Sequence, residues 1–180
     1  MTLVERDKRR FKDLQKRLVN TIGLKAEATH GVINGVKLKL LNMDFVNFKS
    51  PTVTYINLDP SCSGSGLHTH HNRVVKDTER LEKLADMQKI LLKHACNEKN
   101  FSAAQVVCYS TCSVFEEENE QVVNDGVKGF DVDSAAPTFV DAFRKGKFFQ
   151  VTPEKHGCRG FFLAKFRRPV AKKQIKLAKR

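Results

Sequence analysis

Apolar residues recur along the chain in patterns that predict alternating strands and helices. Helical spacing predicts a helix over residues 7–22, ended by Gly23, and a second helix whose apolar face comprises Leu81, Leu84, Ala85, Leu91, Leu92 and Ala95. A short helix with an acidic first turn is expected over residues 116–123. Short apolar runs predict strands at residues 2–4, 36–41, 53–58, 105–109 and 161–166.

Strands that alternate with helices indicate an α/β fold. Because parallel neighbours need crossover connections, we expect a mostly parallel sheet with helices on both faces. Ligands bind such sheets at the carboxyl ends of the strands. The residues that fall at those ends, and are therefore candidates for a ligand site, are Glu5, Asp44, Asp59 and Cys112.

The charge balance narrows the choice of partner. The 180 residues include 32 Lys and Arg against 20 Asp and Glu, a net charge of +12, which predicts a polyanionic partner, nucleic acid ahead of a membrane surface. No apolar run approaches the roughly 20 residues needed to cross a bilayer. The five cysteines follow no secretory signal and form neither an even-numbered framework nor a CxxC pair, which favours a reducing compartment, cytosol or nucleus.

Basic residues gather in two places. The predicted first helix carries Lys8, Arg9, Arg10, Lys12, Lys16 and Arg17. A tail over residues 167–180 carries Arg167, Arg168, Lys172, Lys173, Lys176, Lys179 and Arg180. Charge runs are usually just solvated, but the overall excess favours phosphate contacts for the tail, and a nuclear or nucleolar address is the alternative.

Two cysteine segments carry the most information. Residues 59–66 read Asp-Pro-Ser-Cys-Ser-Gly-Ser-Gly, and residues 109–113 read Tyr-Ser-Thr-Cys-Ser. Each lies at or just after the end of a predicted strand, so Cys62 and Cys112 are expected to face one pocket. Taken singly, a cysteine beside a strand is more often a small buried hydrophobic residue.

These segments resemble the Sun-domain family of RNA cytosine-5 methyltransferases, whose members carry an acidic-Pro-Cys-Ser-Gly type loop and a later Tyr-Ser-Thr-Cys-Ser segment. The resemblance covers most of residues 3–166. Ser61, where most relatives have Pro, is similar to the branch that acts on large-subunit ribosomal RNA. Further matching positions are Leu84, Ala85, Gln88, Leu91, Leu92, Ala95, Glu118, Asn119, Glu120, Pro153, His156, Gly160, Phe161, Phe162 and Ala164.

The resemblance implies a reaction and roles for three residues. Carbon 5 of cytosine is a poor nucleophile, and addition of a thiolate to carbon 6 converts it into an enamine that can attack a sulfonium methyl group. Cys112 would be the nucleophile and Cys62 would promote product release. Asp59 would hold the cytosine near ring nitrogen 3, a role that needs a neutral or shared proton, which burial favours.

S-adenosylmethionine is the cofactor that the resemblance implies. Glu5 would accept hydrogen bonds from its ribose hydroxyls, Arg10 matches a basic residue five positions later, and Asp44 would contact the adenine amine. Asp59 is also assigned to this pocket. For Glu5 and Arg10 the alternative is an ordinary solvated helix start. Asp44 and Asp59 are stronger candidates, because an acid at the end of an apolar strand needs a partner more than an acid on an exposed helix does.

Three histidines, His68, His70 and His71, lie in a Gly- and Ser-rich loop. They suggest a metal site only weakly, because no convincing further ligand set surrounds them. A loop that contacts RNA is the favoured interpretation.

The family places a glycine-rich loop after its first strand, where a helix amino terminus cradles the methionine end of the cofactor. This sequence has no such loop, and Met1 falls where the second strand begins. We therefore expect residues 1–166 to be a partial, Rossmann-like methyltransferase catalytic domain, followed by the basic tail. The two strands that would flank the first strand are expected to have uncovered edges, which makes the chain prone to aggregate. Cofactor binding is expected to be weak.

Two functions of different class remain open. One is an enzyme of ribosomal RNA processing that methylates RNA and is expected in the nucleus, in the nucleolus. The other is a truncated, non-catalytic RNA-binding remnant of such an enzyme.

Overall fold

The computed structural model describes residues 1–25, 28–67, 76–125, 127–133 and 144–169. They form two compact units, Met1–Lys49 and Ser50–Arg180, which are described separately. The three histidines of the predicted loop and the tail from residue 170 onward lie outside the described residues. None of the helices in the described ranges is long and apolar enough to cross a membrane.

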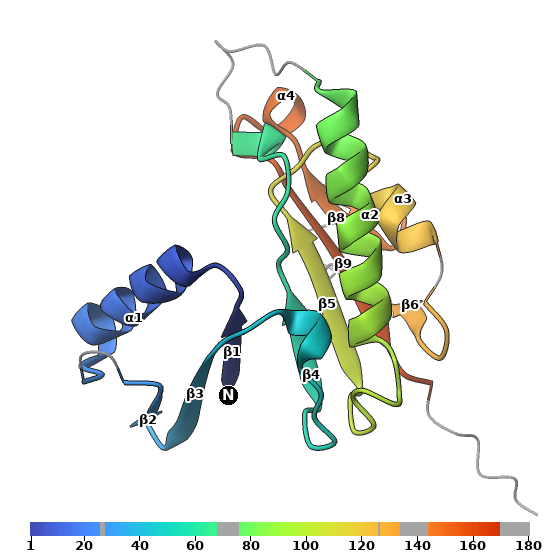
Figure 1. The fold of residues 1–180 in the computed structure, drawn as a ribbon. Coiled ribbons are helices and arrows are strands. Elements are labelled where there is room, and N and C mark those ends of the chain that lie inside the picture. The colour runs from blue at the N-terminus through green and yellow to red at the C-terminus, as the bar shows by residue number, and fades with distance from the viewer. Residues whose placement is uncertain (26–27, 68–75, 126, 134–143, 170–180) are drawn as a thin grey trace, which may run out of the picture. The chain divides into compact units, whose positions relative to one another are not determined.

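The first unit is a small sheet packed against one helix (Figure 1). Its elements are β1 (Thr2–Glu5), α1 (Lys8–Ile22), β2 (His30–Ile33), β3 (Val36–Asn42) and the 3-10 helix η1 (Phe45–Asn47). The core holds Leu24, Leu38 and Leu40 of the strands and their connection, against Phe11, Leu14 and Leu18 of α1. The helical spacing of the apolar residues therefore predicted the side of α1 that packs on the core, although these residues are only partly buried and Ile22, which continues the series, is exposed.

Both ends of α1 follow from the sequence. The Asp7 carboxylate accepts the Arg10 backbone N–H at 2.8 Å and caps the amino terminus of the helix. Gly23 ends the helix in the left-handed conformation, with φ of 66°. The predicted helix over residues 7–22 is confirmed.

The sheet of the first unit has the order β1-β3-β2. β1 runs parallel to β3, whereas β2, which the sequence analysis did not predict, is antiparallel to β3. Asn34 and Gly35 join β2 to β3 and both have positive φ, 48° and 80°. A two-residue Asn-Gly turn of this kind closes an antiparallel hairpin.

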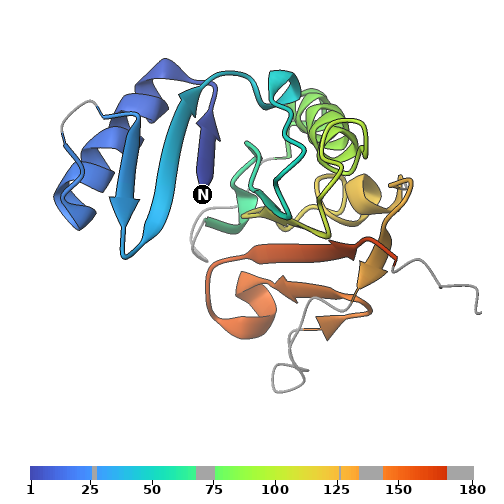
Figure 2. The same cartoon turned by 90° about the horizontal axis from the view of Figure 1, so that it is seen from below.

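The second unit contains a six-stranded sheet. Its path runs β4-β5-β9-β8-β7, with β6 also paired to β9. The helices α2 and α3 contact each other, and α2 contacts β4 (Figures 1 and 2). The elements are β4 (Tyr55–Leu58), η2 (Ser65–Leu67), α2 (Thr78–Ala95), β5 (Val106–Thr111), α3 (Glu120–Asn124), β6 (Asp131–Asp133), β7 (Arg144–Lys145), β8 (Phe148–Val151), α4 (Pro153–His156) and β9 (Phe161–Arg167).

The expectation of a mostly parallel sheet is wrong in detail. Within the second unit β4 and β5 are parallel, but β5, β6 and β8 are each antiparallel to β9, and β7 is antiparallel to β8. The short connection over residues 152–160 cannot carry a crossover, which parallel neighbours require. The sequence analysis missed β6, β7, β8 and α4, which are all short.

β5 is the strand that places the cysteine segments. It lies between β4 and β9, and Val107, Tyr109 and Thr111 are fully buried. In contrast, β1 and β4 each have one hydrogen-bonded neighbour in the described part of the chain, so each ends its sheet. The expectation that uncovered strand edges make the chain prone to aggregate stays a prediction.

Candidate functional site

The two cysteine segments meet at one end of the second sheet. β4 and β5 are parallel neighbours, and Leu58 pairs with Tyr109 just before the segments begin. The Sγ atoms of Cys62 and Cys112 lie 3.1 Å apart, and both residues are half-buried. The expected meeting of the two cysteines is therefore confirmed, while their catalytic roles stay predictions.

The surroundings of Cys62 favour its thiol form. Burial, together with the contact with Cys112, raises the pKa of Cys62 to about 12. Cys62 therefore keeps its proton at neutral pH and is placed to donate a hydrogen bond to the Cys112 sulfur.

Asp59 follows β4 at the same end of the sheet. Its Oδ1 atom lies 3.5 Å from the Ser110 hydroxyl of β5, which donates to it. Partial burial of the carboxyl group raises the pKa of Asp59, and the Ser110 hydrogen bond opposes this shift. A raised pKa favours the protonated carboxyl that the predicted contact with the cytosine ring requires.

Glycine allows the backbones of the two segments to touch. The Gly66 N–H donates to the Cys112 carbonyl at 2.9 Å, and the Gly160 N–H donates to the Gly66 carbonyl at 2.7 Å. A Cβ atom on Gly66 would lie 2.7 Å from the Gly160 Cα and 2.8 Å from the Cys112 carbonyl oxygen. Position 66 therefore admits only glycine without a backbone shift.

A buried carboxylate holds the Cys62 segment. Glu118 is fully buried, and its carboxylate accepts the Ser63 N–H at 2.9 Å and the Ser63 hydroxyl at 2.6 Å. The predicted helix over residues 116–123 is thus partly wrong, because α3 begins only at Glu120 and Glu118 lies in the turn before it. The carboxylate that was interpreted as part of an acidic first turn is instead bound by another segment.

The Cys112 segment has its own buried partners. The Thr111 hydroxyl donates to the Asn119 side-chain oxygen at 2.6 Å, and the Asn119 side-chain N–H donates to the Ser113 carbonyl at 2.9 Å. The Ser65 and Ser113 hydroxyls lie 3.0 Å apart, which links this segment to the first. Glu118 and Asn119 therefore bind neighbouring cysteine segments from adjacent positions.

The predicted cofactor-binding residues Glu5, Arg10 and Asp44 lie in the first unit. Glu5 ends β1, accepts the Asp7 N–H at 2.8 Å and pairs with Arg10 at 3.2 Å. Asp44 follows β3, accepts the Val46 N–H at 3.2 Å and pairs with Arg6 at 3.3 Å. Because β1 and β3 are parallel, both acids fall at the carboxyl ends of neighbouring strands, as the sequence predicted.

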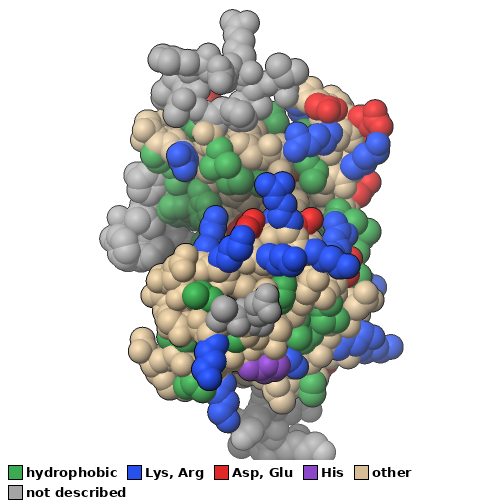
Figure 3. Space-filling view, turned by 60° about the vertical axis from the view of Figure 1, so that its left-hand side comes forward, with side chains coloured by type: hydrophobic (Ala, Val, Ile, Leu, Met, Phe, Trp, Pro, Cys, Tyr) green, Lys and Arg blue, Asp and Glu red, His purple; other side chains and the backbone are tan. Residues whose placement is uncertain are grey.

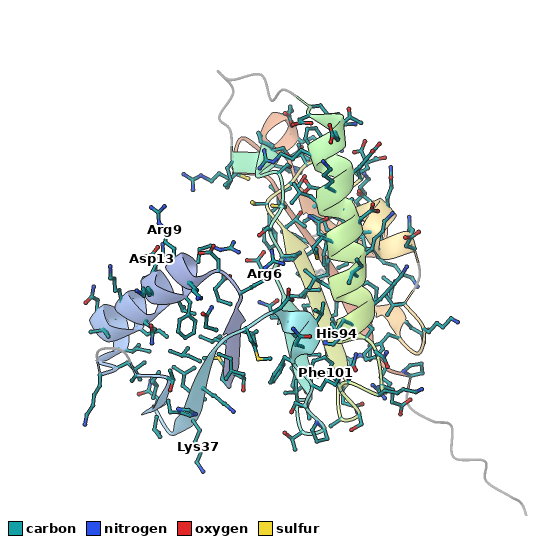
Figure 4. All side chains as sticks on the ribbon, in the orientation of Figure 1. Arg6, Arg9, Asp13, Lys37, His94 and Phe101 are labelled. Carbon is teal, nitrogen blue, oxygen red and sulfur yellow. The ribbon has the colours of Figure 1, made fainter. Side chains whose placement is uncertain are left out.

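Basic side chains are spread over the face shown in Figure 3. On α1, Arg9 and Asp13 both project from the helix (Figure 4), and they border a shallow hollow. The side chains that line this hollow are Lys8, Arg9, Lys12, Asp13 and Lys16. Four of the five are cationic, so this side of α1 is strongly basic.

Arg167 and Arg168 were counted with the basic tail, but both make contacts inside the second unit. Arg167 pairs with Asp133 at 3.0 Å. Arg168 donates to the Phe101 carbonyl, pairs with Glu98 at 3.2 Å and lies over the Phe130 ring. These two arginines stabilise the end of β9, and only the residues after them remain candidates for a free basic tail.

The described residues contain no group of three or more His, Cys, Asp and Glu side chains that is arranged to hold a metal ion. His68, His70 and His71 are outside those residues, so their interpretation as an RNA-contacting loop stays a prediction.

Comparison with known proteins gives a consistent result. The model of the family described as 16S rRNA methyltransferase RsmB/F matches residues 2–167. The 25S rRNA (cytosine-C(5))-methyltransferase rcm1 of Schizosaccharomyces pombe is 39% identical over 129 residues, which are 66% of this chain and 25% of that protein. The 26S rRNA (cytosine-C(5))-methyltransferase nsun-5 of Caenorhabditis elegans is 42% identical over 88 residues, 47% of this chain and 19% of that protein. The chain thus spans a quarter or less of the length of these two curated relatives.

Solved structures show the fold. NSun6 from Pyrococcus horikoshii with SFG has a TM-score of 0.63 and 24% identity, over 93% of this chain and 41% of that one. A methyltransferase homolog protein from Pyrococcus horikoshii has a TM-score of 0.61 and 20% identity, over 93% of this chain and 53% of that one. At these identities the likeness concerns the fold alone, and it confirms the α/β class expected from the sequence.

Proposed function

The chain belongs to the 16S rRNA methyltransferase RsmB/F family, and we propose that it serves in methylation of carbon 5 of a cytosine in large-subunit ribosomal RNA. The relatives named as 25S and 26S rRNA (cytosine-C(5))-methyltransferases support the substrate. The observation that carries the proposal is the 3.1 Å contact between the Cys62 and Cys112 thiols, because the proposed reaction assigns both cysteines to one cytosine ring, Cys112 to attack and Cys62 to release.

Cys112 is assigned the attack on the ring. Its thiolate forms a bond to carbon 6 of cytosine, and the electron pair of the ring double bond moves to carbon 5. Cys62 is a poor nucleophile at neutral pH because its pKa is raised to about 12. The Cys62 Sγ atom instead lies 3.1 Å from the attacking Cys112 sulfur, where it can act in release.

Asp59 and Cys62 act before and after methyl transfer. A protonated Asp59 carboxyl donates to ring nitrogen 3, which makes carbon 6 more electrophilic, and its raised pKa supports this state. After transfer, the proton on carbon 5 must leave and the bond between carbon 6 and the Cys112 sulfur must break. We assign Cys62 to this release step, since its sulfur contacts that of Cys112. The Cys62 thiol gives its proton to the departing Cys112 sulfur, and the Cys62 thiolate formed in this way takes up the proton from carbon 5.

S-adenosylmethionine is the proposed cofactor, and it would supply the methyl group from its sulfonium. Glu5 and Asp44 fit it chemically, since both present partly exposed carboxylates at strand ends, and carboxylates accept hydrogen bonds from hydroxyl and amine groups. Arg10 holds the Glu5 carboxylate at 3.2 Å and so orients it. Asp59, in the second unit, is assigned to the cofactor by the family resemblance alone.

The proposed substrate sets the partner and the location. A net charge of +12 suits association with RNA through its phosphates. For modification of ribosomal RNA of this kind we propose a nuclear location and, within the nucleus, the nucleolus.

Methyl transfer is the direct test. The chain is assayed alone and as a chimaera. In the chimaera, the part of the fission yeast relative that precedes the matched region is joined to the amino terminus of this chain. Both proteins receive large-subunit ribosomal RNA and cofactor that is labelled in its methyl group. Label in 5-methylcytosine, abolished by Cys112→Ala, is the expected result for the chimaera. RNA binding without any label in either form would favour the non-catalytic alternative and contradict the proposal.

A further inference from the structure

Glu118 is an acidic residue that the proposed reaction leaves unused. It is fully buried, and the three donors that the structure gives its carboxylate, two from Ser63 and one from Gln88, carry no formal charge. Burying a carboxylate costs free energy unless hydrogen bonds replace its water. A carboxylate that is buried with no cationic donor among these contacts is therefore expected to serve a function at this position.

The contacts of Glu118 converge on the segment that carries Cys62. Ser63, the next residue after Cys62, donates both its N–H, at 2.9 Å, and its hydroxyl, at 2.6 Å. Gln88 of α2 donates to the same carboxylate and to the Ser61 carbonyl, each at 3.0 Å. The residues on both sides of Cys62 are thus fixed by one carboxylate and the amide beside it.

Glu118 and Gln88 are themselves held by β5. The Tyr109 hydroxyl of β5 donates to the main-chain carbonyl of Glu118 at 2.6 Å and lies 3.1 Å from the Gln88 side-chain oxygen. β5 leads directly into Cys112. The position of Cys62 relative to Cys112 is therefore set through Glu118, Gln88 and Tyr109.

We propose that Glu118 is a positioning residue that keeps the Cys62 thiol against Cys112, so that the releasing cysteine is in place when the covalent adduct forms. The proposal rests on the proposed function, because that function makes these two cysteines the reacting pair. Glu118 touches neither substrate nor cofactor in this account, and it acts only through the Ser61–Ser65 segment.

The effective concentration of the two thiols measures this positioning without RNA or cofactor. The 180-residue chain is equilibrated with reduced and oxidised glutathione. In this exchange Cys62 and Cys112 lose two hydrogens and form a disulfide, while one glutathione disulfide is reduced to two glutathione thiols. Mass spectrometry of the Cys62–Cys112 peptide gives the equilibrium constant. Because the readout involves no methyl transfer, failure here and failure of the methylation assay are distinguishable.

Glu118→Ala should lower that equilibrium constant about tenfold, because hydrogen bonds to a charged acceptor are each worth a factor of this order. A tenfold change corresponds to about 30 mV in reduction potential. Glu118→Gln retains an oxygen to accept the Ser63 N–H, so its equilibrium constant should lie close to that of the unaltered chain. Val122→Ala, a cavity in the buried side of α3, is the control for lowered stability and should leave the constant unchanged.

Ser63→Ala removes the hydroxyl that donates to the Glu118 carboxylate. Because Ser63 is only half-buried, this variant keeps the test available if Glu118→Ala does not fold. It should lower the constant about threefold, since one hydrogen bond is lost. An unchanged constant in both Glu118→Ala and Ser63→Ala, or in Ser63→Ala alone where the first variant is unfolded, overturns the proposal. An equal fall in Val122→Ala would overturn it as well.

Discussion

The Sγ atom of Cys62 lies 3.1 Å from the Sγ atom of Cys112, although 50 positions separate the two residues in the sequence. Their contact follows from the parallel pairing of β4 with β5, which brings the segments after both strands to one end of the sheet. Hydrogen bonds from Gly66 to the Cys112 carbonyl and from Ser63 to Glu118 then fix the approach. The site is thus built mainly by backbone placement.

The close approach at Gly66 predicts a substitution effect. In Gly66→Ala the new methyl group meets backbone atoms at 2.7 and 2.8 Å, which cannot rotate away, so the free energy of unfolding should fall by about 1–3 kcal/mol. Urea unfolding of the purified chain measures the change. In the control Gly31→Ala the first obstacle is the tip of the Leu24 side chain, which can move, and a smaller loss is expected. Equal losses in the two variants would contradict the account of position 66.

Buried Cys96 predicts how stability depends on pH. Burial raises the pKa of Cys96 to about 12 from an ordinary value of 9.0, with Arg168 opposing the shift. Below pH 9 the thiol is neutral in both states, and its contribution is fully present. Between pH 9 and 12 the unfolded chain loses this proton while the folded chain keeps it, so stability falls with rising pH by up to about 1.4 kcal/mol per unit.

Urea unfolding at pH 8.5 and pH 10.5 measures this fall. Cys96→Ala should reduce the difference between the two pH values, because the titrating group is gone. Cys158→Ala is the matched control, since Cys158 is exposed, and it should leave the difference as it was. Identical pH dependence in Cys96→Ala and the unaltered chain would show that Cys96 does not titrate in this way.

The basic tail is expected to contact phosphates. Removal of residues 170–180 should weaken RNA binding and flatten its dependence on salt, because fewer counterions would be released, while sequence preference changes little. Fluorescence anisotropy at several salt concentrations provides the slope. The truncation keeps Arg167 and Arg168, whose contacts with Asp133 and Glu98 belong to the second unit. An unchanged affinity and slope would leave the tail as a localisation signal or a bystander.

The sequence predicted the long elements and the two cysteine segments because their signals are local. Helical spacing and Gly23 predicted α1, and the family resemblance is confirmed by the matching family model. The hairpin strand β2 and the strands β6, β7 and β8 have at most four residues each, too few to show a period. The antiparallel pairing around β9 depends on long-range contacts that no local pattern contains.

The role of Glu118 shows what local patterns cannot give. Its neighbours Glu116, Glu117 and Glu120 are acidic too, and the sequence offers no sign of which one is buried. Only the fold brings Ser63, 55 positions away, to its carboxylate. In the same way, the sequence places Arg168 among tail cations, whereas the structure stacks it over Phe130.

In the proposed reaction Cys112 makes the covalent bond to cytosine and Cys62 releases it. The direct measurement is a denaturing gel of the chimaera with labelled ribosomal RNA and cofactor, followed by mass mapping of any protein–RNA adduct. Cys112→Ala should abolish both methyl transfer and the adduct, whereas Cys62→Ala should let the adduct accumulate, because release is blocked while attack is not. An adduct that persists in Cys112→Ala and is absent in Cys62→Ala would reverse the two roles and contradict the account.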